Sequence, residues 1–426
     1  MLAGFFSGIV QDRKLMREAQ VNIATRWFAG YRLHERLPDH SSLTRIRQRW
    51  GEERFKRIFQ RTVAACIKAG LVNGETVHVD ATLVRADVSW ESVVEDHTEQ
   101  VLVENAVTEG SDEPAVEPPR CKPGRPRKHA PKPKKHSLTD PEATITTSSH
   151  ARRMEPCYKQ HSVVDDKAGV IVDVAVTTGE ASEGKELLAQ LDRAEEQTGK
   201  KVQVVTADAG YAHPGNYAAL EERRVDAVIV PQRGSKTAKK LPVRRFKYDG
   251  RHQVVRCPGG KTLQRQRQQE NGWIYKARGR DCRQCPLKER CTSASEKART
   301  VLIVDGYEPL LRARRRRAKG WDERTRGLYE RHQWRAEGKH GEAKTMHGLR
   351  RAVRRGRVNV AIQAYLTAAV MNLKCLVARI FAGGTPDGPT STIRRVIRTI
   401  IVELGRFSRP LGLRLNRVTV TTYERA

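Results

Sequence analysis

Short segments in which apolar residues alternate with other residues constrain the fold of this chain most. They cover residues 76–80, 160–166, 170–176, 202–208 and 227–230. Alternation with a period of two predicts β-strands, and Gly169 between the second and third segments predicts a hairpin turn. Leu187 and Leu191, at helical spacing, predict a helix after the hairpin, and residues 216–223 predict another before the last strand.

The resulting order of strand, hairpin, helix, strand, helix, strand predicts an α/β fold. It is the order of an RNase H-like core, a mixed sheet with flanking helices. Residues 11–72 instead show helical patterns joined by polar turns, with cap candidates at Ser41 and Ser42. Polar residues interrupt the apolar stretch Val358–Ile380, so we predict a buried packing helix there and no membrane span.

A large excess of basic residues predicts a polyanionic partner. The 426 residues include 80 Lys and Arg against 49 Asp and Glu, which gives a net charge of +31. Because neutralised phosphates release counterions, this balance favours nucleic acid over a ribosomal-type or membrane-surface role. Residues 1–10 lack the basic region of a signal peptide, and only four of the eight cysteines cluster, which predicts a cytoplasmic protein.

Composition also predicts where the chain divides. Residues 93–150 join an acidic stretch to a Pro-rich basic one and hold few apolar residues, which predicts disorder. The expected units are an N-terminal helical, DNA-binding domain (1–72), a first core strand (73–92), a disordered linker (93–150), the RNase H-like core (151–232), a basic Cys-rich insertion (233–318), core helices (319–381), and a linker with a basic tail (382–426).

Three acidic residues stand where the predicted core can form a metal site. Asp80 and Asp208 end predicted strands, and Glu337 lies in a predicted helix. Carboxylate oxygens bind hard cations, and two Mg²⁺ or Mn²⁺ ions about 3.5–4 Å apart can drive in-line displacement at phosphorus. We therefore predict that these residues are catalytic and hold two such ions beside a nucleic-acid backbone.

Residues near Glu337 refine this predicted site. Lys344 follows Glu337 by seven residues, about two helical turns, so both lie on one helix face and Lys344 is predicted to contact DNA. Gly341 between them leaves room for metal or DNA. Glu342 is the nearest rival of Glu337 but lies on a different face. Solvated surface charges are expected instead at Asp165, Asp166 and Asp173.

A cysteine cluster predicts a structural Zn²⁺ site in the insertion. Its members are Cys257, Cys282, Cys285 and Cys291. Four thiolates with one Cys-x₂-Cys pair suit a closed tetrahedral site, and a basic segment with little apolar content needs such a staple. Four unligated thiols are the alternative. No role is expected for Cys66, Cys121, Cys157 and Cys375, with Cys66 and Cys375 buried.

Basic tracts and two aromatic residues predict how DNA is held. Phosphate contacts are expected from Arg350, Arg351, Arg354 and Arg355, and from the run at 312–317. Residues 124–127 resemble an AT-hook core, whose Arg125 and Arg127 would enter a narrow minor groove, although a solvated linker remains open. Trp334 and Tyr329 either stack on an unpaired base or pack in the core.

Several blocks of the sequence resemble bacterial insertion-sequence transposases of the DDE class, in the group related to the IS-four and IS-five elements. The blocks are 37–43, 79–82, 158–161, 207–211, Glu337 with Lys344, 348–356 and 369–374. The resemblance covers roughly residues 20–380 and implies that Asp80, Asp208 and Glu337 are the catalytic triad. Gln333 departs from it, because it stands where the group has an arginine.

This resemblance implies a DNA transposase. It would bind the terminal inverted repeats of double-stranded element ends, assemble as a homodimer or higher synaptic oligomer, and catalyse metal-dependent strand cleavage and strand transfer into target DNA. In a bacterium it would be nucleoid-associated. An RNase H-like DNA nuclease and a catalytically inactive, DNA-binding element remnant are the alternatives, and strand-transfer products distinguish the first from a transposase.

Overall fold

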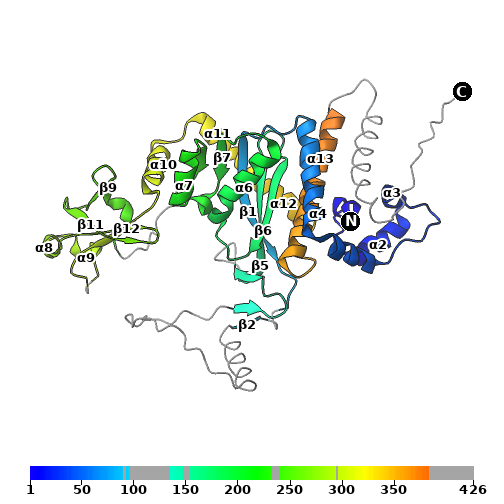
Figure 1. Ribbon diagram of the computed structural model, residues 1–426, viewed down its shortest axis with the longest axis horizontal. Coiled ribbons are helices and arrows are strands. Elements are labelled where there is room, and N and C mark those ends of the chain that lie inside the picture. The colour runs from blue at the N-terminus through cyan, green and yellow to red at the C-terminus, as the bar shows by residue number, and fades with distance from the viewer. Residues whose placement is uncertain (90–92, 96–134, 147–153, 233–239, 294–295, 383–426) are drawn as a thin grey trace, which may run out of the picture.

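A mixed β-sheet forms the centre of the molecule. The computed structural model describes residues 1–89, 93–95, 135–146, 154–232, 240–293 and 296–382 (Figure 1). The strands of the central sheet are β1 (Thr76–Arg85), β4 (Thr144–Thr146), β5 (Glu155–Asp165), β6 (Ile171–Thr178), β7 (Val204–Ala207) and β8 (Asp226–Ile229).

Both parallel and antiparallel pairs occur in this sheet. β1 pairs antiparallel with β5 and parallel with β7, and β7 pairs parallel with β8. On its other side β5 pairs antiparallel with β4 and β6, and β5 and β6 form the hairpin predicted around Gly169. The mixed α/β sheet is therefore confirmed, and its strand order fits the expected RNase H-like core.

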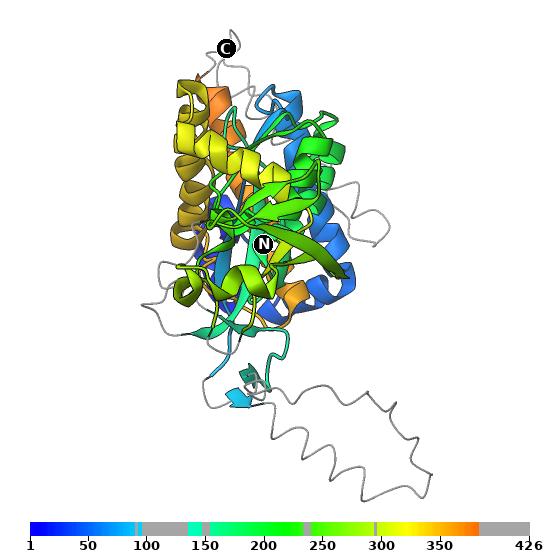
Figure 2. The ribbon, with the colours of Figure 1, turned by 90° about the vertical axis from the view of Figure 1, so that its left-hand side faces the viewer.

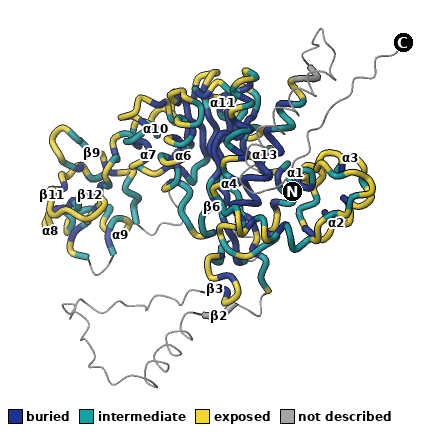
Figure 3. The backbone as a smooth tube through the Cα atoms, turned by 45° about the vertical axis from the view of Figure 1, so that its right-hand side comes forward, coloured by how far each residue is buried: buried dark blue, intermediate teal, exposed yellow. Residues whose placement is uncertain are grey.

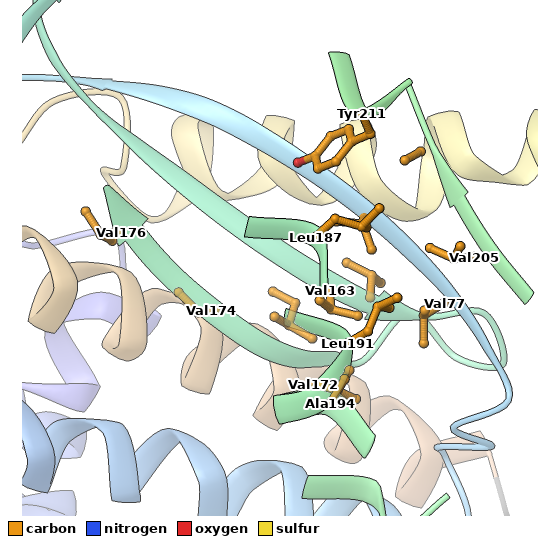
Figure 4. Close-up of a cluster of buried hydrophobic side chains, with 14 of the residues drawn as sticks. Val77, Val163, Val172, Val174, Val176, Leu187, Leu191, Ala194, Val205 and Tyr211 are labelled. Carbon is orange, nitrogen blue, oxygen red and sulfur yellow. The ribbon is translucent and has the colours of Figure 1, made fainter. Parts of the chain in front are cut away.

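Helices cover both faces of the sheet. They are α6 (Glu183–Thr198), α7 (Pro214–Glu222), α10 (Tyr307–Lys319), α11 (Glu323–His332) and α12 (Gly338–Met346). α6 and α7 are the crossovers that parallel strands require. Leu187 and Leu191 of α6 pack with Val77 and Val163 of the sheet (Figure 4). On the opposite face, α11 contacts β7 and β8, and the segment between α11 and α12 contacts β1 and β5.

The N-terminal helices are α1 (Leu2–Phe6), α2 (Asp12–Val21), α3 (Ile23–Phe28) and α4 (His40–Lys68). The cap of α4 is Asp39, whose Oδ1 accepts a hydrogen bond from the Ser41 amide at 2.8 Å, so the predicted cap at Ser41 or Ser42 was wrong. Gly51, with φ of 64°, interrupts α4 and divides it into two helical halves. The second half buries Phe55 and Phe59 in the main core. In Figure 3, much of α2 and α3 is exposed, whereas the central sheet is largely buried.

The long apolar helix α13 (Arg357–Ala382) lies beside α4 and β6 (Figure 1). Within the described residues, one helix, Arg357–Arg379, has the length and composition to cross a membrane, but 78% of its apolar window is buried in the protein. The amide of Asn372 donates to the carbonyl of Ile171 at 2.8 Å, and this polar residue thereby ties α13 to β6. The prediction of a buried packing helix is confirmed.

A second, antiparallel sheet lies to one side of the core and faces the viewer in Figure 2. It contains β9 (Lys247–Asp249), β10 (Val254–Arg256), β11 (Thr262–Gln269), β12 (Gly272–Lys276) and β13 (Thr300–Val304), with the short helices α8 (Gly279–Arg283) and α9 (Lys288–Cys291). Phe246, Val255, Leu263 and Tyr275 are buried here. These residues give the segment a small apolar core, whereas Leu302 of β13 is exposed.

Part of the predicted disordered linker is ordered. β2 (Val93–Glu95) pairs with β3 (Lys135–Ser137), and β4 extends the central sheet. Burial of Ala143 and Asp140 against the core supplies contacts that the composition of residues 93–150 did not indicate. The AT-hook-like tract with Arg125 and Arg127, Cys121, and the tail at 383–426 lie outside the described residues.

Candidate active site

Asp80 lies at the open edge of the central sheet, although it does not end its strand. β1 continues to Arg85 because β5 pairs with it along its whole length, and Asp80 lies opposite Ser162. The prediction that Asp80 ends a strand was therefore wrong. β7 is the shorter neighbour: its last residue, Ala207, pairs with Val79, so β7 leaves one edge of β1 uncovered from Asp80 until Arg85, which bridges to Arg351.

Asp208 follows β7 directly and therefore lies next to Asp80 across the parallel pair. Its Oδ1 accepts a hydrogen bond from the Gly210 amide at 2.7 Å and caps the short helical turn η2 (Ala209–Tyr211). Burial raises the pKa of Asp208 to about 6, and the negative charges of Glu183 and Asp80 add to the rise. The sheet has thus placed two carboxylates so close that each opposes the ionisation of the other.

Glu337 ends a π-helical turn, η4 (Gln333–Glu337), between α11 and α12. Its side chain is exposed, and η4 contacts β1 and β5. Burial raises the pKa of Tyr329, and the charges of Asp208 and Glu337 raise it further, so both acids lie near this phenol. A π-helical turn inside a helix often marks a functional position. Glu337 therefore faces solvent on the side of the sheet to which Asp80 points.

His340 connects the Glu337 helix to Asp80 directly. Its Nδ1 lies 3.2 Å from Asp80 Oδ2, and its Nε2 lies 3.2 Å from the Ser162 hydroxyl. Burial opposes the ionisation of Asp80, but the hydrogen bond and charge of His340 together with the charge of His332 lower its pKa. Sequence reasoning missed His340. The available signal was its position one helical turn after Glu337, on the same face.

A second histidine stands behind this contact. His332 Nδ1 lies 2.9 Å from the Thr206 hydroxyl, which lies 2.6 Å from His78 Nδ1. His78 Nε2 in turn lies 2.9 Å from Asp166, which also accepts from Arg331. Within the described part of the chain, His332 Nε2 is buried without a hydrogen-bond partner. This buried polar chain holds α11 against the sheet under the two aspartates.

A fourth acid, Glu183, lies at the same edge. It is in the first turn of α6, and its Oε1 lies 3.2 Å from Lys159 Nζ of β5. Lys159 also donates to the Ala181 carbonyl at 2.8 Å. Glu183 was not singled out by the sequence, because it is one of several charges that begin an amphipathic helix.

The carboxylates offer the hard oxygen ligands that Mg²⁺ and Mn²⁺ bind. Asp80 and Asp208 fit this role, because they are adjacent and Asp208 is destabilised in its charged form without a counter-ion. Glu337 stands apart in solvent. Within the described ranges no group of three or more His, Cys, Asp or Glu side chains is gathered closely enough to hold a metal ion.

The acids excluded from the predicted site do have other roles. Asp165 and Asp173 are buried rather than solvated, so the surface-charge expectation was wrong for them. Asp165 accepts from the Asn73, Gly74 and Lys167 amides, and Asp173 pairs with Arg193 at 3.0 Å. Glu342 is held by Lys339, Lys374 and His347. Each of these carboxylates holds loops or helices together at a distance from the sheet edge.

The predicted basic contacts differ in exposure, and several of them have partners within the chain. Arg350, Arg351 and Arg355 are exposed, and Arg351 pairs with Asp87 at 3.3 Å. Arg354 is instead held by Asp12, which also binds Arg47, and all three are largely buried. In the run at 312–317, Arg312 pairs with Glu221 and Arg316 with Asp226.

Other predicted DNA contacts are near the catalytic candidates. Lys344 is half-buried beside β5, where its charge acts on Cys157. Trp334 is 69% exposed on η4, three residues before Glu337. Tyr329 packs edge-on against Trp321 with ring centroids 5.0 Å apart and stacks on His332, so core packing accounts for it. Only Trp334 of this aromatic pair is available to a base.

The clustered cysteines line one small cavity beside the second sheet. They are Cys257, Cys282, Cys285 and Cys291. The Lys261 amide donates to Cys257 Sγ at 3.3 Å, and a Cβ on Gly259 would lie 3.4 Å from Cys285 Sγ and 3.7 Å from Cys257 Sγ. The thiols therefore converge on one cavity without forming, in this arrangement, a closed metal cluster. Cys66 is fully buried as expected, whereas Cys375 is only partly buried.

Two family models match the chain. Residues 256–377 match a Transposase DDE domain, and residues 1–49 match a Transposase domain known as DUF772. The first match includes the cysteine cluster and Glu337 but begins after Asp80 and Asp208.

One solved structure that the chain resembles is a cryo-EM structure of the piggyBac transposase synaptic complex with hairpin DNA. The alignment has 10% sequence identity and a TM-score of 0.37, and it covers 99% of this chain and 76% of that one. No curated protein matches. Transposase-domain models therefore match both the start of the chain and the region that contains Glu337.

Proposed function

We propose that this protein is an insertion-sequence transposase that cuts and joins DNA at a metal site formed by Asp80, Asp208 and Glu337. The observation that supports this most directly is the parallel pairing of β1 with β7, which sets Asp80 beside Asp208 at an open sheet edge. Glu337 enters the same region from the helix whose next turn contacts Asp80. The block pattern of the sequence also supports membership in the group related to the IS-four and IS-five elements.

Each residue of the proposed site has a distinct role in the reaction. Bound Mg²⁺ or Mn²⁺ supplies an activated water or 3′-hydroxyl and neutralises charge at phosphorus. Asp80 and Asp208 would hold the ions on the rigid sheet, and the exposed Glu337 would supply a further carboxylate. His340 fixes the Asp80 carboxylate through the 3.2 Å contact, so that one oxygen faces the ions.

The DNA would lie along the basic surface beside this edge. Arg350, Arg351 and Arg355 follow α12 and are exposed, so they can neutralise phosphates, with Lys344 nearer the scissile bond. Trp334, exposed one turn before Glu337, can stack on an unpaired end base. The N-terminal helices would bind the terminal repeats of a synaptic homodimer or larger oligomer, in the cytoplasm at the nucleoid.

The test uses purified protein, Mg²⁺ and a duplex of the DNA that flanks the coding region. Asp80→Asn, Asp208→Asn and Glu337→Gln are expected to abolish strand cleavage and strand transfer while end binding in a gel assay stays within about threefold, since phosphate contacts dominate affinity. Glu330→Gln on α11 and Asp192→Asn on α6, both exposed, are the matched controls. Cleavage at the wild-type rate by any of the three variants would refute the assignment.

Separate readouts distinguish the transposase from the alternatives. Cleavage without strand-transfer products would identify a nuclease, and end binding without cleavage by the wild-type protein would identify an inactive remnant. Trp334→Ala is an informative companion variant. We expect it to reduce joining of the end while leaving the metal affinity unchanged, because Trp334 contacts DNA and not the ions in this scheme.

We also propose a structural Zn²⁺ in the cavity lined by Cys257, Cys282, Cys285 and Cys291. Convergence of the four sulfurs on one cavity supports it, as does the amide hydrogen bond to Cys257 Sγ, which stabilises a thiolate. Small movements of the loops around Gly259 would close the tetrahedral site. Its function would be to stabilise the second sheet, not to take part in DNA chemistry.

A further inference from the structure

We propose that Glu183 is a fourth carboxylate of the metal site and binds, together with Asp208, one of the two divalent cations. This inference rests on the proposed function, because it concerns the same sheet edge. It goes beyond the triad, since Glu183 comes from α6, the crossover helix on the opposite face of the sheet from Glu337. The sheet edge would thus be approached by acids from both faces.

The geometry above Gly210 carries the proposal. A Cβ on Gly210 would lie 2.5 Å from Glu183 Oε2 and 2.9 Å from Asp208 Oδ1. The two carboxylate oxygens therefore converge on one point, from a helix N-terminal turn and from the end of β7. Any side chain at position 210 would collide with both of them. Two negatively charged oxygens that face each other across so small a space repel unless a cation lies between them.

A buried, unpaired phenol beside these acids is independent evidence of a missing ligand. Tyr211 is fully buried, and its hydroxyl has no hydrogen-bond partner among the described residues. Burial raises the pKa of Tyr211, and the charges of Asp80, Glu183, Asp208 and Glu186 raise it further, so its hydroxyl lies near these acids. An unsatisfied buried hydroxyl is costly. A water molecule held by the bound ion would offer the partner that the protein itself does not.

Lys159 explains how Glu183 is held when no ion is present. Its ammonium lies 3.2 Å from Glu183 Oε1, whereas Oε2 is the oxygen near Asp208. One oxygen of Glu183 is thus oriented by Lys159 and the other is left for the cation. The positive charge of Lys159 lies near the proposed ion position and repels a cation there, so it lowers the affinity of the site for the metal ion.

The test measures Mn²⁺ binding to the full-length protein without DNA, by calorimetry and by the electron paramagnetic resonance signal of free Mn²⁺. Glu183→Gln is expected to weaken one binding event at least about tenfold, the scale of losing a supporting group at a metal site. Asp192→Asn, on the same helix and paired with Arg223, is the matched control and is expected to bind as the wild type does. Wild-type Mn²⁺ binding by Glu183→Gln would overturn the inference.

A second variant separates ligation from a purely structural ion pair. If Glu183 served only as the partner of Lys159, Lys159→Met and Glu183→Gln would weaken Mn²⁺ binding alike, and the inference would fail. As a ligand, Glu183 should bind Mn²⁺ more tightly in Lys159→Met, because a competing charge has been removed. Asp80→Asn and Asp208→Asn report on the proposed function separately. If Asp80→Asn and Asp208→Asn leave the Mn²⁺ affinity unchanged, the metal site itself is refuted. If these two variants lower the Mn²⁺ affinity but Glu183→Gln does not, only the role of Glu183 as a fourth ligand is refuted.

Discussion

Asp208 carries its charge at a cost to the stability of the metal-free protein. Burial and the charges of Glu183 and Asp80 raise its pKa to about 6, above its ordinary value of 3.8. Asp80 differs, because the histidines around it favour its charged form. At residue scale the site therefore contains one acid that the protein stabilises as an anion and one that only a cation can stabilise. This division is expected of a site made to receive metal.

Replacing Asp208 should therefore stabilise the metal-free protein at neutral pH. Below pH 3.8 the carboxyl is protonated in both the folded and unfolded states, and above about 6 the folded state carries an unfavourable charge. We expect Asp208→Asn to raise the free energy of unfolding by about 1–2 kcal/mol at pH 7.5 and by nothing at pH 3.5, after allowing for solvent screening.

Thermal unfolding in the presence and absence of Mg²⁺ measures this effect. The wild type should gain stability when Mg²⁺ is added and the variant should not, because the ion binds the folded carboxylate. Asp192→Asn controls for the loss of a surface acid. A variant less stable than the wild type at pH 7.5 without metal would contradict the account.

His340 is a positioning residue whose contribution can be measured in the same way. His340→Ala removes the 3.2 Å contact to Asp80, and we expect the cleavage rate to fall about 10–100-fold, as is usual when a group that orients a metal ligand is removed. His340→Asn can restore a hydrogen bond and should recover part of the rate. Equal loss in both variants, with unchanged Mn²⁺ affinity, would show that His340 does not act through Asp80.

At the scale of elements, the register of β1 with β7 and the path of α11 into α12 decide the site. Neither strand is unusual alone, but the early end of β7 opens one side of β1 at Asp80. The π-helical turn η4 then carries Glu337 into solvent while α12 keeps His340 on the sheet. Glu342 anchors α12 to α13 through Lys374 and so fixes the position of this helix.

Removing that anchor should loosen α12 in a pH-dependent manner. Hydrogen bonds from His347 and Lys374, with the charge of Lys339, outweigh burial and hold the pKa of Glu342 well below its ordinary value of 4.5. This stability is present above pH 4.5 and is lost as the pH falls. We expect Glu342→Gln to lower the free energy of unfolding by about 1–2 kcal/mol at pH 7.

Urea unfolding at pH 7 and pH 3 measures this difference, which should shrink at the lower pH. Glu330→Gln on α11 is the control, since Glu330 is exposed. A difference that is equal at the two pH values would mean that the Glu342 charge is not the cause.

Over the whole molecule, segments far apart in the sequence are joined into one core. α4 packs on α13, and the N-terminal helices are tied to the segment after α12 by Asp12, which binds Arg47 at 2.7 Å and also Arg354. The second sheet stands to one side, attached through α10, which packs on α7 (Figure 1). The sheet edge that carries Asp80 and Asp208 is therefore connected to both the N-terminal helices and the cysteine-bearing unit.

The Asp12 cluster should determine whether the N-terminal helices stay attached. Asp12→Ala leaves two largely buried arginines without their shared partner, and such a loss typically costs about 3–5 kcal/mol. We expect faster proteolysis and amide exchange in residues 1–49. Exchange that is unchanged there would mean that apolar contacts alone hold these helices.

The cysteine cavity makes a separate prediction at this scale. A zinc chelator, or Cys282→Ser with Cys285→Ser, should unfold residues 240–304 while the central sheet stays folded, because structural zinc contributes directly to folding. Metal analysis of the untreated protein should find one zinc per chain. Protein without zinc and with full protection of this region would refute the zinc site.

Local pattern was sufficient to predict five strands of the central sheet, the crossover helices and α13, because apolar periodicity determines which face of each element must be buried, but it did not predict β4 or the strands of the second sheet. It also identified Asp80, Asp208 and Glu337 as candidates. It could not show that Asp165 and Asp173 are buried, since their partners lie in distant segments, or that residues 135–146 are ordered against the core. The surroundings of the acids, including His340, Glu183 and Lys159, were decided only by tertiary structure. Which charges become neighbours depends on strand register and helix docking, and these are set by the packing of the whole core.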